Sequence, residues 1–265
     1  MSIDFDLKGD YILLAGAFRG IGFELAKLLL SCGSKVILIG KNKKSSLKTK
    51  QELNKYFSSD NFSLITCDIY KENKRTQLVN DIQNLNIQKI NHFVSFIGSG
   101  KTQPGINFNI NHWFDVFNKN FFSVVDLVNI LLPILSYNKD RMNSIILTSA
   151  IAGLERVGAP ATYSCAKSAL TAYISHLAEQ LSDKNIRVNG VSPGNIYFKG
   201  GRWEEIIAEK GQEFIRSNVL ENVSLKRFGN AQELAWTYLN ILSPRNSFLN
   251  GTNIIIDGQQ IKRII

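Results

Sequence analysis

The sequence lacks any apolar run long enough to cross a bilayer. A membrane-spanning helix needs about 20 consecutive apolar residues, and the longest candidates, residues 124–135 and 145–154, contain polar breaks. Residues 1–6 include acidic side chains, and no basic segment followed by an apolar run begins the chain, so no secretory signal is expected. We therefore expect a cytoplasmic protein that makes no membrane contact.

Cysteine and histidine are scarce, with three of each in 265 residues. The odd number and wide spacing of the cysteines do not indicate a disulfide framework, so we expect free thiols in a reducing compartment. Neither residue type recurs at a metal-ligand spacing, and no metal site is expected. The residues are Cys32, Cys67, Cys165, His92, His112 and His176.

Acidic residues are outnumbered, because 31 lysines and arginines face 22 aspartates and glutamates and give a net charge of +9. The lysines concentrate in residues 41–55, and no basic stripe with interleaved aromatic residues accompanies them. We therefore expect no nucleic-acid partner. The segment is interpreted as a solvated basic surface, part of which serves an anionic cofactor.

Short apolar runs alternate with amphipathic segments along the whole chain. Continuous apolar runs such as residues 35–39 are typical of strands in a parallel sheet that helices cover on both faces. The alternation predicts an α/β fold with a doubly wound, mostly parallel Rossmann-type sheet of about seven strands and right-handed crossovers. The expected strands are 11–15, 35–39, 62–67, 92–97, 144–148, 187–191 and 253–256, and the expected helices are 22–32, 71–84, 113–135, 161–182 and 231–242.

No segment rich in proline, glycine or serine divides the chain. Residues 1–265 are therefore expected to form one domain, and a hydrophobic content of 44% is sufficient for a packed core. Residues 195–221 fit the alternation of strands and helices least well. Insertions over the carboxyl ends of parallel strands often form substrate lids, and we expect a lid here.

A glycine-rich turn, residues 16–22, joins the first expected strand to the first expected helix, with the spacing Gly-x-x-x-Gly-x-Gly. The first glycine permits a tight turn, the second lets backbone N–H groups approach a pyrophosphate, and the third allows the helix to pack closely on the strand. The positive end of the helix then faces the phosphates. An ordinary strand–helix turn is the alternative, but the context favours a cofactor. The expected cofactor-binding residues of this turn are Gly16, Phe18, Arg19, Gly20, Ile21 and Gly22.

The end of the second expected strand carries no acidic residue. NAD-binding sites place a carboxylate there for the ribose hydroxyls, whereas NADP-binding sites place a cation for the 2′-phosphate. Lys41 stands at this point, and Arg19 in the glycine turn offers a second cation. We therefore expect NADP(H) as the cofactor, with NAD(H) less favoured. Lys43 and Lys44 are also consistent with a solvated loop.

Tyr163 and Lys167 stand four residues apart near the start of a long expected helix. Residues at this spacing share a helix face, and an ammonium beside a phenol lowers the pKa of the tyrosine. The phenol can then donate or accept a proton near neutral pH. A Tyr-x-x-x-Lys pair alone is common, but this pair follows the 144–148 strand and a glycine turn far upstream.

Residues 95–102, Ser-Phe-Ile-Gly-Ser-Gly-Lys-Thr, partly match a phosphate-binding P-loop. The first required glycine is replaced by Ser95, and Pro104 and Gly105 would interrupt the helix that must follow. We therefore do not expect a nucleoside triphosphatase.

The ordered set of motifs along residues 8–258 resembles the short-chain dehydrogenase/reductase family. The resemblance implies that Tyr163 handles the proton of a substrate hydroxyl or carbonyl, and that Lys167 binds the nicotinamide ribose and tunes the tyrosine. It also implies that Asn120 holds a water molecule in the proton relay. Further cofactor contacts that the resemblance implies are Asp68, Ile69, Gly98, Pro193, Gly194 and Ile196.

The chain departs from the family pattern at the catalytic serine. Counting back from Tyr163 places Ala150 at that position, and Ser149 precedes it. Either a one-residue shift lets Ser149 orient the substrate oxygen, or the role of the serine is lost and water or a substrate group replaces it. Losing one oriented donor can cost about 3 kcal/mol of transition-state stabilisation. Ser95 and Ala15 also replace the residues usual in the family.

The leading hypothesis is an NADP(H)-dependent oxidoreductase that interconverts a carbonyl and a secondary alcohol of a small-molecule substrate by hydride transfer. Arg156 and the cations and aromatics of residues 197–203 suit a polar or anionic substrate such as a sugar derivative, although these side chains are also consistent with a closed lid and a solvated surface. The alternative is a catalytically impaired, cofactor-binding homologue with a regulatory or scaffold role. The resemblance further implies a homotetramer or homodimer built through residues 113–135 and 161–182.

Overall fold

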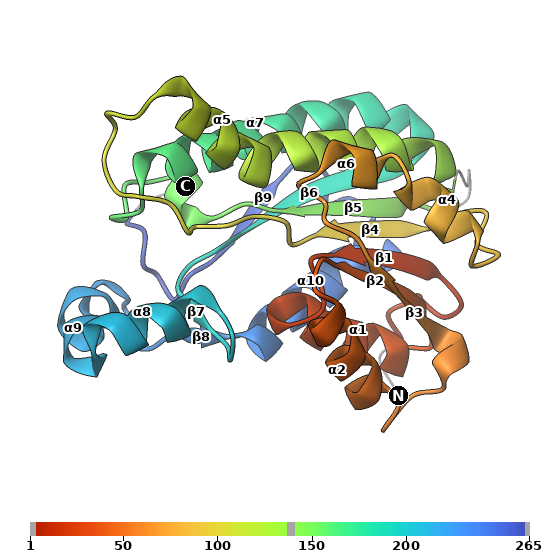
Figure 1. Ribbon diagram of the computed structural model, residues 1–265. Helices are drawn as coiled ribbons and strands as arrows, with labels where there is room; N and C mark the ends of the chain where they lie inside the picture. Colours follow the sequence, from red (N-terminus) through yellow and green to blue (C-terminus); the bar gives the residue numbers. More distant parts are fainter. Residues whose placement is uncertain (1–3, 137–140, 263–265) are drawn as a thin grey trace.

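The computed structural model describes residues 4–136 and 141–262 and contains a central sheet of seven parallel strands (Figure 1). The strand order is β3-β2-β1-β4-β5-β6-β9, so the direction of winding reverses between β1 and β4. The predicted doubly wound sheet is confirmed. Its strands are β1 (Tyr11–Ala15), β2 (Lys35–Gly40), β3 (Phe62–Thr66), β4 (His92–Ser95), β5 (Asn143–Thr148), β6 (Ile186–Pro193) and β9 (Asn253–Ile256).

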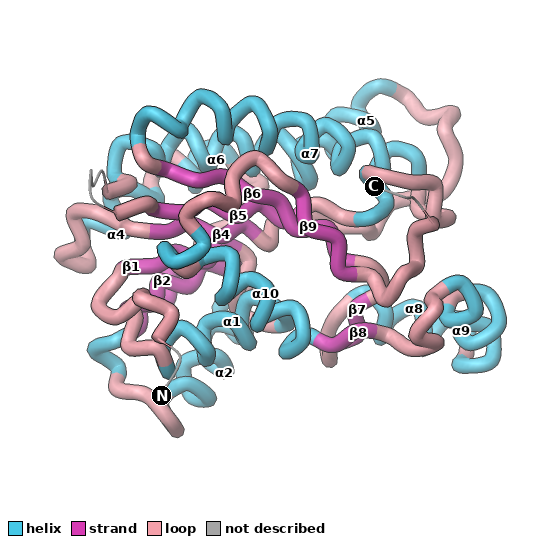
Figure 2. The backbone as a smooth tube through the Cα atoms, turned by 180° about the vertical axis from the view of Figure 1, so that it is seen from behind, coloured by secondary structure: helices cyan, strands magenta, loops and turns pink. Residues whose placement is uncertain are grey.

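Helices cover both faces of the sheet (Figures 1 and 2). On one face lie α1 (Gly20–Ser31), α2 (Lys43–Leu53) and α10 (Ala231–Leu242), and on the other lie α3 (Glu72–Arg75), α4 (Leu78–Gln83), α5 (Ile110–Phe117), α6 (Ser123–Leu131) and α7 (Ala161–Leu181). Among the described residues, no helix combines the length and the apolar character that a bilayer crossing requires.

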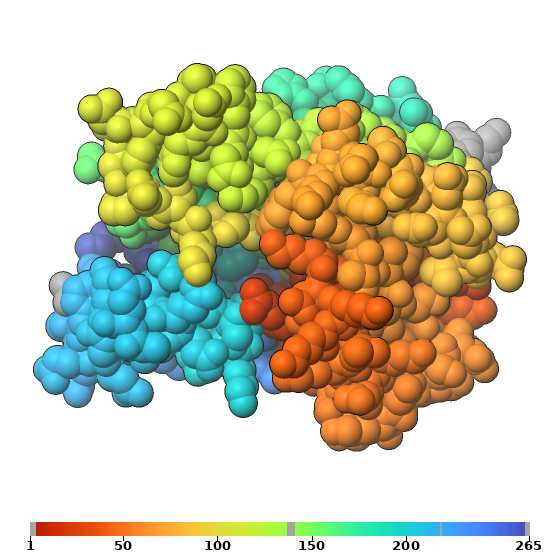
Figure 3. Space-filling view, viewed as in Figure 1, coloured from red at the N-terminus to blue at the C-terminus, as the bar shows by residue number. Residues whose placement is uncertain are grey.

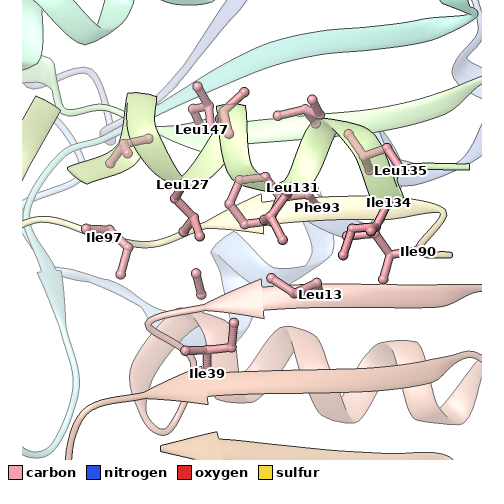
Figure 4. Packing of buried hydrophobic residues seen from close by; sticks show 14 of the residues in the cluster. Leu13, Ile39, Ile90, Phe93, Ile97, Leu127, Leu131, Ile134, Leu135 and Leu147 are labelled. Carbon is pink, nitrogen blue, oxygen red and sulfur yellow. The ribbon is translucent and has the colours of Figure 1, made fainter. Parts of the chain in front are cut away.

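Alternate residues of each strand point to opposite faces, and this alternation divides the core into two layers. Leu13 of β1 packs in the cluster beneath α6 and α7, whereas its neighbours Ile12 and Leu14 pack in the cluster beneath α1 and α10. Figure 4 shows Leu127 and Leu131 of α6 packed over the first of these layers. Burial on both faces explains why the strands read as continuous apolar runs rather than as alternating patterns.

Three helical segments differ from the prediction, and one of them is the helix expected over residues 71–84, which is divided into α3 and α4. The lysine-rich stretch after β2 forms α2, with the side chain of Asn42 capping its first turn through the N–H of Ser45. The long helix expected over residues 113–135 begins at Ile110 and is interrupted by a π-helical turn, η2 (Asn118–Phe122). Such turns occur frequently at functional sites, because they rotate the side chains that follow them.

The predicted lid segment, residues 195–221, forms a separate layer beyond the carboxyl ends of the strands (Figure 1). Its first strand, β7 (Ile196–Tyr197), pairs with β8 (Gly229–Asn230) in a small parallel sheet. Helices α8 (Arg202–Lys210) and α9 (Gln212–Asn218) follow β7. The pairing with β8 joins this layer to the start of α10, which packs on the main sheet.

A buried arginine ties α10 to the sheet. Arg187 of β6 is 1% exposed, and its guanidinium donates hydrogen bonds to the carbonyls of Ile241, Leu242 and Ser243 at the end of α10, and to that of Leu249. Burial lowers the pKa of Arg187 to about 10, which still leaves it charged at neutral pH. The cation therefore satisfies carbonyls that the helix end leaves without partners and that carry its negative dipole charge.

We predict that Arg187→Met lowers the free energy of unfolding by about 3 kcal/mol, because several buried carbonyls lose their hydrogen-bond donor together. Urea denaturation monitored by circular dichroism measures the effect. The exposed Arg245 just beyond α10 is the matched control, and Arg245→Met should change the free energy of unfolding little. Equal losses in both variants would show that Arg187 does not hold the helix end.

Candidate active site

The glycine turn between β1 and α1 has the conformation that its spacing predicts. Gly16 and Gly20 have φ values of +82° and +61°, which favour glycine. A Cβ at Gly22 would lie 2.7 Å from the Cα of Ala17, so only glycine fits between helix and strand. No side chain caps the first turn of α1, and its N–H groups therefore face the carboxyl edge of the sheet without a side-chain partner.

The other residues of this turn have different surroundings. The ring of Phe18 is buried against Gly40 at the end of β2, and the carbonyl of Phe18 accepts a hydrogen bond from Thr49 in α2. Ile21 packs against the core beneath α1. These two side chains therefore fix the position of the turn, and only their backbone is available to a ligand.

The two cations predicted for a 2′-phosphate both lie at this edge. The guanidinium of Arg19 donates to the carbonyl of Gly200 in the lid segment. The ammonium of Lys41 lies 5.3 Å from the centre of the ring of Tyr70. Neither cation is paired with a carboxylate in the described part of the chain, so each has a weaker partner than an anionic ligand would be.

The segment after β3 contains the residues expected to contact the adenine. Asp68 is partly exposed, and its carboxylate accepts a hydrogen bond from the N–H of Tyr70 at 3.3 Å. Ile69 is buried in the core, and its carbonyl accepts from Arg75 at 2.6 Å. The carboxylate of Asp68 is thus partly accessible to solvent, whereas the side chain of Ile69 serves packing.

Lys167 of α7 is buried and is held by main-chain carbonyls rather than by an acid. Its Nζ donates to the carbonyl of Thr148 at 2.9 Å and to that of Ile97 at 3.4 Å. A Cβ at Gly98 would lie 2.9 Å from this Nζ and 3.0 Å from Oδ1 of Asn120. Glycine at position 98 therefore lets the lysine, the asparagine and the loop after β4 meet.

Asn120 lies in the π-helical turn and is fully buried. Its Oδ1 accepts from the N–H of Ser99 at 2.8 Å, and its Nδ2 donates to the carbonyls of Ser99 and Val116. The side chain is therefore satisfied within the protein and holds the loop after β4 in place. These contacts use both donors of the amide, and the role in the proton relay that the resemblance implies for Asn120 stays a prediction.

The structure distinguishes the two residues that compete for the serine position. The hydroxyl of Ser149 is turned into α7, where it contacts the carbonyl of Lys167 at 3.0 Å and the hydroxyl of Thr171 at 2.9 Å. Both residues line the cavity described below, so the direction of the Ser149 hydroxyl is what separates them. The orientation therefore does not support the prediction that Ser149 shifts to hold a substrate oxygen.

The end of β6 carries the other predicted cofactor residues. Gly194 donates to the carbonyl of Ile256 at 2.9 Å, and a Cβ there would lie 2.7 Å from the Cα of Asp257. Pro193 lines the cavity, whereas Ile196 is buried against Gly229 in the small sheet. The backbone at Pro193 and Gly194 faces the site, and the side chain of Ile196 does not.

A cavity of about 940 Å³ opens at the carboxyl ends of β4, β5 and β6. Tyr163, Lys167 and Ala150 line its inner part, and α8 and α9 form its outer wall with residues that include Trp203 and Phe214. In Figure 3 the surface is hollowed between the yellow segment near residue 100, the red glycine turn and the cyan lid helices. The cavity thus joins the Tyr-Lys pair to the lid.

The pKa of Tyr163 shifts in the direction opposite to the one that the sequence predicted. Burial raises the pKa of Tyr163 to about 12 and lowers that of Lys167 to about 7. The expected lowering of the tyrosine pKa by the lysine is absent, because the ammonium is itself disfavoured by burial and is bound to carbonyls. In this state Tyr163 is a neutral phenol, and Lys167 changes charge near neutral pH.

Three residues at the site escaped the sequence analysis. Tyr70 contacts Lys41, as described above, and Nδ2 of Asn195 and Oε1 of Gln260 are buried at the cavity wall without a hydrogen-bond partner among the described residues. The position of Asn195 directly after Pro193 and Gly194 could have indicated it. Tyr70 likewise follows the predicted residues Asp68 and Ile69, whereas no local pattern marks Gln260.

The lowered pKa of Lys167 predicts how stability depends on pH. Between about pH 7 and 10.5 the unfolded chain binds more protons at this lysine than the folded chain does. The contribution of Lys167 to the free energy of unfolding therefore rises with pH through that window. This contribution reaches its full value above pH 10.5 and is lost as the pH falls towards 7. We predict that Lys167→Met removes this slope in urea denaturation at pH 7, 8 and 9.

The control for this experiment is the exposed Lys184, because Lys184→Met should leave the slope unchanged. Comparing slopes rather than absolute stabilities separates the titration from any loss of packing in the variant. A slope in Lys167→Met equal to that of the unaltered protein would contradict the lowered pKa.

Similarity to known proteins agrees with this geometry. Residues 16–258 match the family described as enoyl-(acyl carrier protein) reductase. An isoepoxydon dehydrogenase of Penicillium expansum is 27% identical over 256 residues, which cover 95% of each chain. A 3-oxoacyl-[acyl-carrier-protein] reductase of Chlamydia muridarum is also 27% identical over 256 residues, covering 93% of this chain and 95% of that protein.

Solved structures show the same fold at lower identity. L-sorbose reductase from Gluconobacter frateurii, complexed with NADPH and L-sorbose, superposes with a TM-score of 0.89 at 20% identity over 99% of this chain and 100% of that one. The Pseudomonas aeruginosa RhlG/NADP active-site complex has a TM-score of 0.84 at 24% identity, covering 98% and 99% of the two chains. Because the family match spans most of the sequence, the chain belongs to the short-chain dehydrogenase/reductase family of oxidoreductases.

Proposed function

We propose that the protein is an NADP(H)-dependent oxidoreductase that interconverts a carbonyl and a secondary alcohol. The observation that carries the proposal is the meeting of Tyr163, Lys167 and Gly98 at one cavity, at the same edge of the sheet as the glycine turn. In open α/β sheets, ligands bind in the crevice at this edge where the strand order reverses. Here the order reverses between β1 and β4.

The residues at the crevice fit a dinucleotide with a 2′-phosphate. The uncapped start of α1 and the backbone at Gly20 suit the pyrophosphate. Lys41 and Arg19 provide positive charge where the ribose phosphate would lie, and β2 ends without a carboxylate that would favour NAD(H). The two solved structures described above are complexes with NADPH and with NADP, which agrees with this preference.

When bound, the nicotinamide supplies or accepts the hydride. In the reducing direction the neutral phenol of Tyr163 donates its proton to the carbonyl oxygen as the hydride adds to the carbonyl carbon. The protonated form of Lys167 stabilises the phenolate that this leaves behind. In the oxidising direction the phenolate takes the proton from the alcohol oxygen. Asn120 acts by holding the loop after β4 against Lys167.

Ala150 removes one hydrogen-bond donor to the substrate oxygen. We predict that Ala150→Ser raises kcat by about tenfold or more, because a single oriented donor contributes several kcal/mol to such transition states. Tyr163→Phe should abolish turnover. The assay follows NADPH absorbance with a panel of ketones and aldehydes.

The matched control for this prediction is Ala152→Ser, because Ala152 is another buried alanine at the wall of the same cavity. The added hydroxyl there should not change kcat. Equal rates in the two serine variants would show that position 150 does not face the reacting oxygen.

We further propose a polar or anionic substrate such as a sugar derivative. The outer cavity carries Arg156, Arg202, Lys210 and Lys262, and Glu155 is the acidic residue among those that line it. Arg202 is paired with a glutamate of its own helix, which leaves a net positive charge at the mouth of the cavity. Such a mouth attracts anions and raises their association rate.

This substrate proposal predicts a charge preference. A keto acid should have a higher kcat/KM than its neutral amide, and the difference should shrink by about threefold to tenfold in Arg156→Ala and as salt is added. The exposed Arg216 of α9 does not line the cavity and serves as the control in Arg216→Ala. No preference for the acid would contradict an anionic substrate.

The second candidate is a catalytically impaired homologue that binds the cofactor in a regulatory or scaffold role. Ala150 favours this candidate, because it provides no hydroxyl at the catalytic position. The hydroxyl of Ser149 is hydrogen-bonded to α7 and does not replace the missing donor. NADPH binding without turnover, unchanged by Tyr163→Phe, would select this candidate. The cytoplasmic location and the homotetramer or homodimer stay predictions from the sequence.

A further inference from the structure

Tyr70 is the residue that follows Asp68 and Ile69 beyond the end of β3. Its backbone is fixed on both sides, because its N–H donates to Asp68 and its carbonyl accepts from Nδ2 of Asn118 at 3.1 Å. The side chain is partly buried and projects from this anchored backbone. A change of rotamer is therefore sufficient to move the ring without moving the strand.

The side chain of Tyr70 spans the crevice at the point where the strand order reverses. One face of its ring lies under the ammonium of Lys41, which follows β2, at 5.3 Å from the ring centre. Its hydroxyl lies near the N–H of Gly98, which follows β4, and near enough to Arg19 to feel its charge. β1 lies between β2 and β4 in the sheet, so the ring reaches across the carboxyl end of β1.

We propose that Tyr70 occupies the adenosine part of the dinucleotide site in the cofactor-free protein, and that a cofactor binds only when this ring turns away from Lys41 and Gly98. This inference rests on the proposed function. The protein then exists in a closed form, with the ring in the crevice, and an open form that can bind. The apparent dissociation constant exceeds the intrinsic one by the reciprocal of the open fraction.

The shape of the cavity agrees with an occupied adenosine site. The cavity reaches Ile97, Gly98 and Ser99 from the substrate side. The described residues that line it do not include Lys41, Asp68 or Arg19, although these stand at the same edge of the sheet. Tyr70 is not among these lining residues either, so the cavity ends before it reaches the ring.

The contacts that keep the ring in place are ones that a phosphate can replace. An exposed ammonium over an aromatic face gains little, because water competes for the charge. A phosphate offers Lys41 an anionic oxygen, and charge-assisted hydrogen bonds are about twice as strong as neutral ones. Arg19 is held in a similar way by the neutral carbonyl of Gly200 and can exchange it for the same phosphate. The 2′-phosphate is thus the group best suited to displace the ring.

Equilibrium binding of NADPH and of adenosine 2′,5′-bisphosphate tests the proposal without any turnover. Calorimetry or NADPH fluorescence gives the dissociation constants for the unaltered protein, Tyr70→Phe and Tyr70→Ala. We expect Tyr70→Ala to tighten both ligands by about tenfold, because the ring and its cation–π contact with Lys41 are both removed from the closed form. Tyr70→Phe keeps the ring and removes only the hydroxyl near Gly98, so it should tighten binding by about threefold.

The control is Tyr56→Ala, an exposed tyrosine outside the crevice, which should leave both dissociation constants unchanged. Thermal unfolding of each variant verifies that it is folded. Weaker binding in Tyr70→Ala would overturn the proposal, because the ring would then be a wall that supports the adenine. Unchanged binding would overturn it as well.

The outcomes separate this inference from the proposed function. If the unaltered protein binds NADPH but Tyr70→Ala gains nothing, only the occupancy by Tyr70 is wrong. If neither protein binds NADPH or the bisphosphate, the cofactor assignment fails and the inference fails with it. Stopped-flow association adds a kinetic measure, because removing the closed form should raise the association rate by the same factor as the affinity.

Discussion

The site depends on a buried ammonium that contacts no acidic side chain among the residues that the structure describes. Nζ of Lys167 links α7 to the carboxyl ends of β4 and β5 through two main-chain carbonyls, and it leaves room beside it for glycine alone at position 98. Asn120 then joins the same cluster from the π-helical turn. The pKa of an ammonium held in this way lies close to neutral pH. Burial disfavours the charged form, and the hydrogen bonds to the carbonyls partly offset that penalty.

The cations at the cofactor crevice resemble Lys167 in one respect, because each contacts a neutral group rather than a carboxylate. Arg19 is held by a lid carbonyl and Lys41 by an aromatic face. The ring of Phe198 also lies close to Gly20, so the lid segment packs directly on the glycine turn. Arg19 and Gly20 therefore both contact the lid segment, which connects the glycine turn to the outer wall of the cavity physically.

The sequence predicted the features that local spacing determines. The glycine turn, the Tyr163–Lys167 pair and the apolar runs each specify their own backbone, and the structure brings them to one edge of the sheet. It could not predict which way the hydroxyl of Ser149 turns, because that depends on contacts with α7. The pKa directions also escaped prediction, since burial depends on the packing of distant elements. Tyr70 directly follows the predicted residues Asp68 and Ile69, but no spacing indicates where its ring lies.

A crystal structure of the protein with NADP⁺ tests the central claim most directly. The account predicts the pyrophosphate at the start of α1, the 2′-phosphate between Lys41 and Arg19, and the nicotinamide ring beside Tyr163 within the cavity. A nicotinamide bound away from Tyr163, or crystals that take up no dinucleotide at concentrations that saturate related enzymes, would contradict it.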